Sequence, residues 1–487
     1  MTASSSGTIT AATALHHYAG LNSMVSGLDR CFLNQHGVIA RGGRTTSLDI
    51  TVRRAALAGL IGTMLENYDF VIYGTASALV FGPLFFPEIS PVAALLASFS
   101  AYAVGFVARP LGGLFFSHFG EKLGRKWVMV TTLFLMGGAT FAIGCIPDYR
   151  SIGVLAPILL VLCRALQGFG AGAEQSGGAT LLTETAPLGR RGRLSSLVMV
   201  GAALGGVLGA GAWVLAQQLP EDALMSWGWR TVFWSSLIVT IAAAIIRSKM
   251  AESPVFEELK ETVDVEDQAP LKVVATHGWR RVLRVVLMNW GVSTQSYMYQ
   301  VFLVGYLAAV VGVGTTFIPP VQLAASVAAA CAAFITGALS DRFGRRRMAL
   351  ILCGILVISP FIVFPGLNSG SKVVIAAIIV LGYMFAAQGV TGIHMSYLPE
   401  LFGSRYRYSG VTLGREISAV IGGGIAPLLG SALLTLFLDS WIPIAVYMAI
   451  TMLVSFLATF TAPETVNRDL TLLTDAEDGE ARPVVTA

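Results

Sequence analysis

The sequence has little charge for its length. Only 12% of its 487 residues are charged, whereas about 25% is usual for soluble proteins. So few charges cannot cover a surface that faces water. The 55% of hydrophobic residues and the mean hydropathy of +0.71 therefore predict that lipid covers much of the molecule. The net charge of +4 is small and spread along the chain, which gives no reason to expect a nucleic-acid partner.

Cysteine is scarce, and the motifs of metal sites are missing. None of the five cysteines is paired at metal-ligand spacing, and neither Cys-x-x-Cys nor His-Glu-x-x-His occurs. Four of the five lie in apolar runs, which indicates buried, inert thiols. Because no nucleophile–base pair or metal cluster is visible either, we expect no enzyme activity, no metal and no cofactor, with protons as the coupling ion.

The two ends of the chain differ from its middle. Residues 1–50 are polar, rich in Ser, Thr and Gly, and lack both helical periodicity and the long apolar core of a secretory signal. We expect a disordered cytoplasmic tail there; a start codon placed too far upstream is the alternative interpretation. Residues 464–487 are also polar, and we expect a second disordered cytoplasmic tail.

Between the tails, apolar stretches recur at the length needed to cross a bilayer. Each of them has roughly 17–28 residues, and about 20 helical residues span the hydrocarbon core. We predict twelve helices, at residues 54–77, 93–116, 127–147, 153–176, 194–217, 229–248, 283–308, 319–339, 348–366, 373–395, 409–436 and 440–462. The longest polar stretch divides them six and six. It predicts a six-helix bundle over residues 51–250, a cytoplasmic loop over 251–282 and a second bundle over 283–463.

The basic residues fall in alternate loops. Arginines and lysines near residues 53, 122–126, 190–193, 260–281, 342–347 and 405–407 would all lie on one side of the membrane, and the opposite loops hold few. Since basic loops stay in the cytoplasm, the pattern predicts a multi-pass protein of the inner or plasma membrane with both termini cytoplasmic.

A repeated loop links the two halves. SHFGEKLGRK, residues 117–126, follows the second predicted helix, and GALSDRFGRR, residues 337–346, follows the eighth. Matching loops at equivalent positions indicate a six-plus-six duplication. The residues of interest are Glu121, Lys122, Gly124 and Arg125 in the first copy, and Gly337, Asp341, Arg342, Gly344 and Arg345 in the second.

The loop pattern Gly-x-x-x-Asp-Arg-x-Gly-Arg-Arg resembles the hallmark of the major facilitator superfamily. The second copy matches in full, the first departs at Ser117 and Glu121, and the fourth helix carries the similar motif Arg164-x-x-Gln167-Gly168. The runs ENYDFVIYGT, VGFVARPLGG and RYSGVTLG resemble one branch, the metabolite:proton symporters for citrate, α-ketoglutarate, shikimate, proline and betaine. Asn67 and Gln175 depart from that branch, and we expect both changes to touch the cavity.

The resemblance implies an all-α membrane protein with twelve helices in two bundles. It also implies alternating access around a site between the bundles. The glycine run from Gly201 to Gly209 in the fifth helix lets helices approach closely. It lacks the Pro of the antiporter-type version, which favours symport.

Charged residues inside the predicted helices call for an explanation, because each costs roughly 3 kcal/mol or more at the bilayer centre unless it is paired or hydrated. Glu66 and Asp69 lie on one face of the first helix, and Arg164 and Glu174 lie on one face of the fourth. One interpretation is a proton site, in which an approaching Arg164 changes the affinity of the acids for protons. The other is a static ion pair between the two helices, and Arg164 alternatively suits a substrate carboxylate.

Further polar residues are candidates for the substrate cavity. Asn289, Ser293, Ser296 and Gln300 form a stripe on the seventh helix, and substrate contact and contacts between helices explain it equally well. Tyr73, Gln167 and Tyr383 complete the cavity candidates. For Arg109 we expect mainly a structural role, either pairing with residues of the eleventh helix or reaching toward the cytoplasm. Arg415 and Glu416 lie about 100° apart on the eleventh helix, which suits different neighbours. For Glu416, a second proton site and an ion pair explain the residue equally well.

The two loops have a different predicted role. In each copy the acid, Glu121 or Asp341, lies at the cytoplasmic end of its helix and can pair with loop arginines and with a helix N-terminus in the facing half. Such contacts exist only when the cytoplasmic side is closed, so they would stabilise the outward-open state. The alternative is that the basic residues only set topology.

These features predict a secondary active transporter that takes up a small polar metabolite, such as an organic acid or zwitterion, together with protons. An exporter or a uniporter of the same fold is the alternative, and a non-transporting membrane sensor is a third. We expect the lipid bilayer and a small-molecule substrate as partners, and function as a monomer.

Overall fold

The computed structural model describes most of the chain. It covers residues 45–88, 91–123, 125–172, 174–248, 278–314, 316–404, 406–472 and 474–477, without the side chains of 45–51, 54, 58, 91, 92, 95, 117–129 and 246–248. Residues 51–487 form one compact unit, to which every contact below belongs, and residues 1–50 form another. The predicted N-terminal tail, up to residue 44, and most of the predicted central loop lie outside the described residues.

The first half of the compact unit is helical throughout its described residues. Its elements are α2 (Thr45–Leu79), α3 (Phe81–Phe85), α4 (Pro91–Leu123), α5 (Arg125–Cys145), α6 (Tyr149–Ile152), α7 (Leu155–Ala171), α8 (Glu174–Thr185), α9 (Arg191–Ser195), α10 (Leu197–Ala216), α11 (Glu221–Ala223), the π-helical turn η1 (Leu224–Gly228) and α12 (Trp229–Ser248). We call residues 51–248 the N-terminal half.

The second half, residues 278–477, is built in the same way, and no strand occurs in the described part of the chain. Its elements are α15 (Trp279–Tyr297), η3 (Met298–Phe302), α16 (Leu303–Ala309), α17 (Ile318–Phe343), α18 (Arg345–Ile358), α19 (Pro360–Leu367), α20 (Lys372–Gly382), η4 (Tyr383–Gly389), α21 (Val390–Glu400), α22 (Arg407–Ala419), η5 (Val420–Gly424), α23 (Ile425–Leu436) and α24 (Ile442–Phe460). We call it the C-terminal half.

These elements make twelve membrane-crossing segments. Eight described segments are long and apolar enough to span a bilayer, or nine if α18 and α19, bent by 46°, count as one. The other three, in chain order, are α2, α5 and the continuous run α15–η3–α16. In the residues that the structure describes, the fold is therefore helical, and its long helical segments match the twelve helices that the sequence predicts. Several helices extend beyond their predicted ends, as α17 does to Phe343 and α21 to Glu400.

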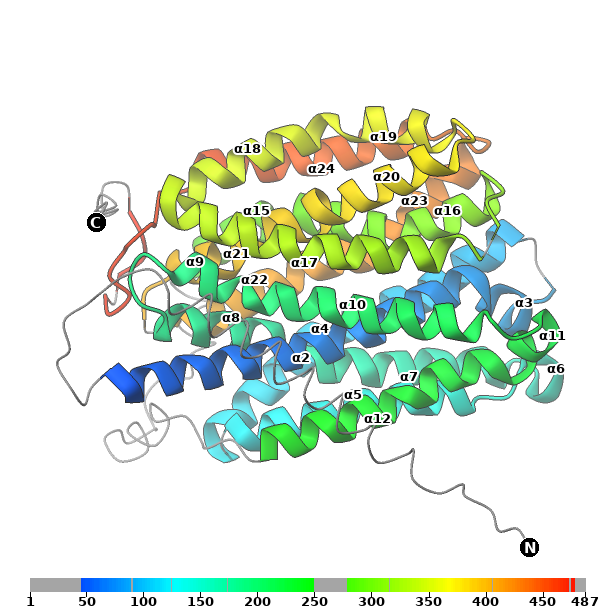
Figure 1. The fold of residues 1–487 in the computed structure, drawn as a ribbon, viewed down its shortest axis with the longest axis horizontal. Helices are drawn as coiled ribbons and strands as arrows, with labels where there is room; N and C mark the ends of the chain where they lie inside the picture. Colours follow the sequence, from blue (N-terminus) through cyan, green and yellow to red (C-terminus); the bar gives the residue numbers. More distant parts are fainter. Residues whose placement is uncertain are drawn as a thin grey trace, which may run out of the picture. The chain divides into compact units, whose positions relative to one another are not determined.

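The helices lie side by side in nearly the same direction (Figure 1), with α8, α9, α21 and α22 close to one end and α3, α6 and α11 at the other. We call the first the basic end, because Arg191, Arg345 and Arg407 lie there. The two halves meet mainly where α10 packs on α17 and where α4 packs on α22, η5 and α23. Large apolar side chains such as Ile238 and Val373, 72% and 78% exposed, line the outside, as expected for a surface that faces lipid.

Glycines bring neighbouring helices into backbone contact. A Cβ atom on Gly168 of α7 would lie 1.8 Å from the carbonyl oxygen of Gly105 in α4, and one on Gly112 would lie 1.8 Å from that of Phe169. Gly201 and Gly205 of α10 approach the carbonyl groups of Leu60 and Met64 in the same way. The close approach predicted for the glycine run of the fifth helix is thus confirmed. Without a hydrophobic drive between helices in lipid, such contacts supply packing.

The segment after α24 does not match the disordered tail that we expected from residue 464. Its polar side chains bind backbone groups at helix ends: Glu464 accepts from the N–H groups of Arg345 and Arg346, and Arg468 donates to the carbonyl groups of Glu400 and Phe402. Ser404 and Ala476 add two backbone hydrogen bonds to the segment. Polar composition alone suggested disorder, but helix ends leave unpaired backbone groups that polar side chains can satisfy.

Candidate functional site

The basic end is closed by Asp341, at the end of α17. Its Oδ1 and Oδ2 atoms accept hydrogen bonds from the backbone N–H groups of Gly192 and Arg193, both at 2.8 Å. These donors start the helical run α9–α10 of the other half, where the helix dipole also favours a negative charge. Arg345 pairs with the same carboxylate at 2.8 Å. This is the contact between halves that the sequence predicts for the second loop.

Further ion pairs surround Asp341. Arg345 also pairs with Glu400 at 3.2 Å, within the C-terminal half, and Arg407 crosses to Glu184 of the N-terminal half at 2.9 Å. Arg191 adds a hydrogen bond to the carbonyl group of Arg468. Asp341, Arg407 and Arg191 therefore each join the two halves at this end.

Steric constraints explain why glycine occupies two positions of the second loop. A Cβ on Gly337 would lie 2.6 Å from the carbonyl oxygen of Gly192 in the facing half, and Gly344 has φ +98°, a conformation that side chains disfavour. Arg342 is exposed and stacks on the ring of Phe343. In the first loop, Gly124 and the side chains of Glu121, Lys122 and Arg125 lie outside the described residues, so their role stays a prediction.

A buried charge cluster joins the halves at mid-height. Arg109 of α4 donates from Nη1 to Glu66 Oε1 of α2 at 2.6 Å, and from Nε and Nη2 to both carboxylate oxygens of Glu416 in α22 at 2.7 and 3.2 Å. All three side chains are at most 3% exposed. The forked guanidinium thus bridges one acid from each half, a geometry that suits arginine. We call Glu66, Arg109 and Glu416 the central triad.

The triad corrects one prediction from the sequence. We expected Arg164 to face Glu66 and Asp69, but Glu66 pairs with Arg109. The helical wheel correctly predicted that Glu66 and Asp69 share a face that avoids lipid, since both are buried. The predicted partner of Glu66 was wrong, because a helical wheel does not show which neighbouring helix supplies the arginine. The weaker expectation, that Arg109 reaches the eleventh helix, is confirmed by Glu416.

Arg164 lies in an aromatic cage instead. Its guanidinium carbon is 4.3–4.7 Å from the ring centroids of Phe70, Tyr73 and Tyr102. Nη1 donates to Gln167, while Nε and Nη2 have no hydrogen-bond partner among the described residues. Cation–π contacts of this kind stabilise a desolvated arginine.

Asp69 is held beside this cage. It is buried next to Thr140, Gln167 and Arg164, and Gln167 Nε2 donates to Thr140 Oγ1 at 2.6 Å. Glu174 begins α8, close enough to Glu66 for an electrostatic interaction. The four proton-coupling candidates thus share one region of the N-terminal half, but in two clusters rather than one.

A cavity opens on the triad between the halves. It has room for a few water molecules. Its polar lining comprises Asn67, Arg109, Gln175, Asn289, Ser293, Ser296, Tyr297, Gln300, Gln388, Thr391, Arg415 and Glu416. Three helices of the C-terminal half carry a π-helical turn at this level (η3, η4, η5). Such turns often mark functional sites.

The structure places some of the predicted cavity residues in the lining and others elsewhere. Asn289, Ser293, Ser296 and Gln300 all line the cavity, as do Asn67 and Gln175, the two departures from the branch pattern. Tyr73, Gln167 and Tyr383 do not. The Tyr73 ring contacts the guanidinium of Arg164, and Gln167 accepts a hydrogen bond from it. The Tyr383 hydroxyl accepts a hydrogen bond from Gln322. The sequence did not predict that Gln388 and Thr391 line the cavity. The side-chain amide of Gln388 within an apolar helix was the signal that could have indicated it.

Arg415 and His394 lie together at one side of the cavity. Arg415 donates to Gln175 Oε1 of the N-terminal half and to the sulfur of Met395. His394 Nδ1 lies 3.1 Å from Asn289 Oδ1, and its Nε2 is buried without a partner in the described structure. A single histidine within an apolar helix is more often structural than a proton carrier, and the hydrogen bond between His394 and Asn289 agrees with a structural role.

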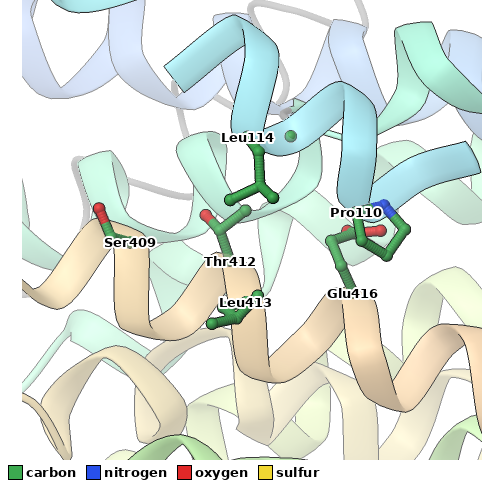
Figure 2. Close-up of a pocket in the computed structure, with 7 residues that line it drawn as sticks. Pro110, Leu114, Ser409, Thr412, Leu413 and Glu416 are labelled. Carbon is green, nitrogen blue, oxygen red and sulfur yellow. The ribbon is translucent and has the colours of Figure 1, made fainter. Parts of the chain in front are cut away.

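A second, smaller hollow lies between α4 and α22. Pro110, Gly113 and Leu114 face Ser409, Thr412, Leu413 and Glu416 across it. Figure 2 shows the Glu416 side chain directed at Pro110. The hollow has room for about one water. The central cavity is larger and is lined by polar residues of both halves, so it is the candidate site.

Comparisons with known proteins agree with this architecture. Residues 60–414 match the family model described as Major Facilitator Superfamily. The chain is 34% identical over 405 residues to the shikimate transporter of Escherichia coli K12, covering 83% of this chain and 92% of that one. It is 31% identical over 446 residues to the proline/betaine transporter of the same organism, covering 87% and 85%.

Solved structures show the same fold. The E. coli xylose transporter XylE in a partially occluded inward-open conformation superposes with a TM-score of 0.67 at 16% identity, over 85% of this chain and 99% of that one. XylE described as a proton:xylose symporter gives a TM-score of 0.65 at 16% identity, over 87% and 98%. At this identity the likeness concerns the fold alone. With its twelve helices, its central cavity and these relatives, the chain is a multi-pass membrane transporter that belongs to the major facilitator superfamily.

Proposed function

We propose that this transporter takes up a small polar metabolite, an organic acid or a zwitterion, together with protons, and works as a monomer. The observation that carries the proposal is the central triad. One guanidinium holds a carboxylate from each half, buried beside the cavity, and Glu66 Oε2 has no hydrogen-bond partner in the described structure. A spare carboxylate oxygen in this position can take a proton.

The triad links protonation to movement of the halves. With both acids ionised, the ion pairs of Arg109 with Glu66 and Glu416 hold α2 and α22 against α4 and join the two halves beside the cavity. A proton on Glu66 or Glu416 neutralises that carboxylate and weakens its interaction with Arg109, because charge-assisted hydrogen bonds are about twice as strong as neutral ones. Alternating access then follows when the contacts of Asp341 and Arg407 at the basic end also break.

The relatives support the substrate class. The shikimate and the proline/betaine transporters carry, by their names, an acid and zwitterions. The exporter and uniporter alternatives differ in the direction and coupling of flux, so one experiment separates them. Purified protein in liposomes is given shikimate, proline or glycine betaine with an inward proton gradient, with and without a protonophore. Gradient-dependent accumulation is expected, and accumulation that ignores the protonophore would reject proton coupling.

The triad is tested by Glu66→Gln. Since glutamine cannot release a proton, we expect loss of gradient-driven accumulation while exchange of substrate across the membrane at equal concentrations continues. Asp222→Asn, an exposed acid far from the cavity, is the matched control and should behave as the parent protein. Concentrative uptake by Glu66→Gln at the parent level would show that the triad is only structural.

We also propose that the basic end and both termini face the cytoplasm of a cell membrane, which the basic loops support. A cysteine placed at the exposed Leu188, in a protein without other cysteines, tests this. A membrane-impermeant thiol reagent added outside intact cells should leave it unlabelled, and labelling from outside would reverse the orientation.

A further inference from the structure

The cavity contains two arginines in different electrostatic situations. Arg109 forms direct ion pairs with both carboxylates of the triad. Arg415 binds only neutral groups, the amide oxygen of Gln175 and the sulfur of Met395. Among the described residues no carboxylate lies within ion-pair distance of Arg415; Glu66 and Glu416 act on it only from farther away. The cavity therefore offers one guanidinium that lacks a direct counter-ion.

Burial raises the free-energy cost of a charged Arg415 without a direct counter-ion. The Arg415 side chain is 6% exposed, and a charge at this depth is expensive unless it is paired. An arriving carboxylate would supply the missing partner. The guanidinium fork matches a carboxylate with two parallel hydrogen bonds, which an ammonium or an amide cannot reproduce. Gln175, now bonded to Arg415, reaches it from the opposite half, so a bound carboxylate would replace a contact that joins the halves.

Apart from Arg109, Arg415 and Glu416, the polar residues of the lining are uncharged. Asn289, Ser293, Ser296 and Gln300 form one wall, and the nearby Gln388 has a buried amide oxygen without a hydrogen-bond partner in the described structure. Such groups suit the hydroxyl groups of a substrate. Recognition of a quaternary ammonium group relies on several aromatic faces, whereas the lining has one aromatic residue, Tyr297. The aromatic cage of Phe70, Tyr73 and Tyr102 is already filled by Arg164.

The charges around the cavity balance without a substrate. Arg109 and Arg415 are matched by Glu66 and Glu416. His394 adds no charge when neutral, and a cation there would face Arg415 in a buried site. Glu174 on α8, Asp69 on α2 and Tyr297 on α15 also lie in this region. Tyr297 is uncharged, Asp69 is offset by Arg164, and Glu174 has an interaction of its own, so none of the three enters the match. A monocarboxylate would leave one excess negative charge, which one proton on the triad removes.

We infer that Arg415 anchors the carboxylate of a small hydroxylated monocarboxylate, and that the cavity carries this anion with one proton as an electrically neutral pair. The inference rests on the proposed proton-coupled uptake and names its substrate class, the anchoring residue and the stoichiometry.

The anchor is tested by binding, which needs no transport. Calorimetry of the purified full chain in detergent uses shikimate as the hydroxylated monocarboxylate, methyl shikimate as its uncharged ester, and glycine betaine. We expect shikimate to bind and the other two to bind weakly or not at all. Arg415→Gln should weaken shikimate binding roughly 30-fold or more, because the two charge-assisted hydrogen bonds are lost. Arg415→Lys should recover part of the affinity, and the exposed Arg347→Gln should match the parent.

Two results would overturn the anchor: equal binding of the ester, or unchanged shikimate binding in a folded Arg415→Gln protein. Tighter binding of betaine, which also carries a carboxylate, would overturn the hydroxylated substrate class. If Arg415→Gln does not fold, the comparison of shikimate with its ester in the parent protein still decides the point. The ester replaces the charged carboxylate with an uncharged group that is one methyl larger, so equal affinity would exclude a carboxylate anchor.

The stoichiometry is tested separately in liposomes. A proton gradient without a membrane potential should drive shikimate accumulation. A potential made by potassium and valinomycin at equal pH should not, and accumulation driven by the potential would refute the neutral pair. The two proposals fail differently. Binding through Arg415 without gradient-driven uptake rejects proton-coupled uptake and leaves the anchor. Gradient-driven uptake of betaine that Arg415→Gln does not affect rejects the anchor and leaves proton-coupled uptake.

Discussion

Replacing Asp341 with asparagine tests how the basic end is held closed. The carboxylate accepts two backbone hydrogen bonds from Gly192 and Arg193 in the facing half, both at 2.8 Å. Asparagine keeps one acceptor oxygen and turns an NH₂ group toward the second donor. One hydrogen bond between the halves is therefore lost and the other loses its charge. The Arg345 contact lies within one half and exists whether this end is open or closed, so it does not bias the equilibrium.

The size of the effect follows from these two bonds. A hydrogen bond to a charged group contributes about 1.5–3 kcal/mol. Losing one and weakening the other should cost the closed arrangement about 2–4 kcal/mol. Because each 1.4 kcal/mol is a factor of ten, the ratio of open to closed molecules should rise roughly 30-fold to 1000-fold. A population that is mostly closed at the basic end would become mostly open there.

Spin labels on the two halves would measure the change. Cysteines at Leu188 and Arg347, both exposed, are introduced into a protein without its native cysteines, and the distance distribution between them is recorded. Asp341→Asn should add a longer distance. Glu464→Gln is the matched control, because Glu464 also accepts two backbone N–H groups at a helix start, but within one half. A parent-like distribution in Asp341→Asn, or an equal shift in the control, would refute the reasoning.

The remaining predictions concern the first loop, the helix contacts and the C-terminal segment. Glu121→Gln should lengthen the same spin-label distance less than Asp341→Asn, because the second loop is the complete copy; equal shifts would reject this asymmetry. Gly112→Ala should lower stability by about 3 kcal/mol or more, because a Cβ there meets the backbone of Phe169, whereas Gly138→Ala, with open space around it, should stay within about 0.5 kcal/mol. Thermal unfolding in detergent measures both, and similar melting temperatures would contradict the packing argument. Arg468→Ala removes hydrogen bonds to the carbonyl groups of Glu400, Phe402 and Thr474 and should speed hydrogen exchange across residues 464–477, with Arg347→Ala as the control. Unchanged exchange would show that other contacts hold the segment.

The loops and the polar stripe show how far local pattern reaches. The acid of the second loop and its spacing to glycine and arginine predicted a contact with a helix start in the facing half, and Asp341 makes it. The stripe from Asn289 to Gln300 predicted a face that avoids lipid, and it lines the cavity. Both predictions depend on residues within one helix or one loop, where periodicity fixes which side chains share a face.

Pairing between helices was harder to predict. Arg109 and Arg164 are both single arginines in apolar helices, and the sequence offered no means to tell which would reach Glu66. The structure gives Glu66 to Arg109 and surrounds Arg164 with three aromatic rings. The C-terminal segment was misjudged for a related reason. Glu464 and Arg468 look like solvated charges in sequence, and only the folded bundle supplies the helix ends that they bind.

The sequence by itself determined the low charge, the twelve apolar segments, their division into two halves and the repeated loop. Each of these depends on local composition, because a helix in lipid satisfies its own backbone and needs only enough apolar length. The tertiary structure decided which charges meet: the triad, the cage around Arg164 and, among the described residues, an Arg415 guanidinium without a direct ion pair. The rotation and neighbours of each helix set those contacts, and glycine contacts such as Gly112 on Phe169 fix them by steric fit.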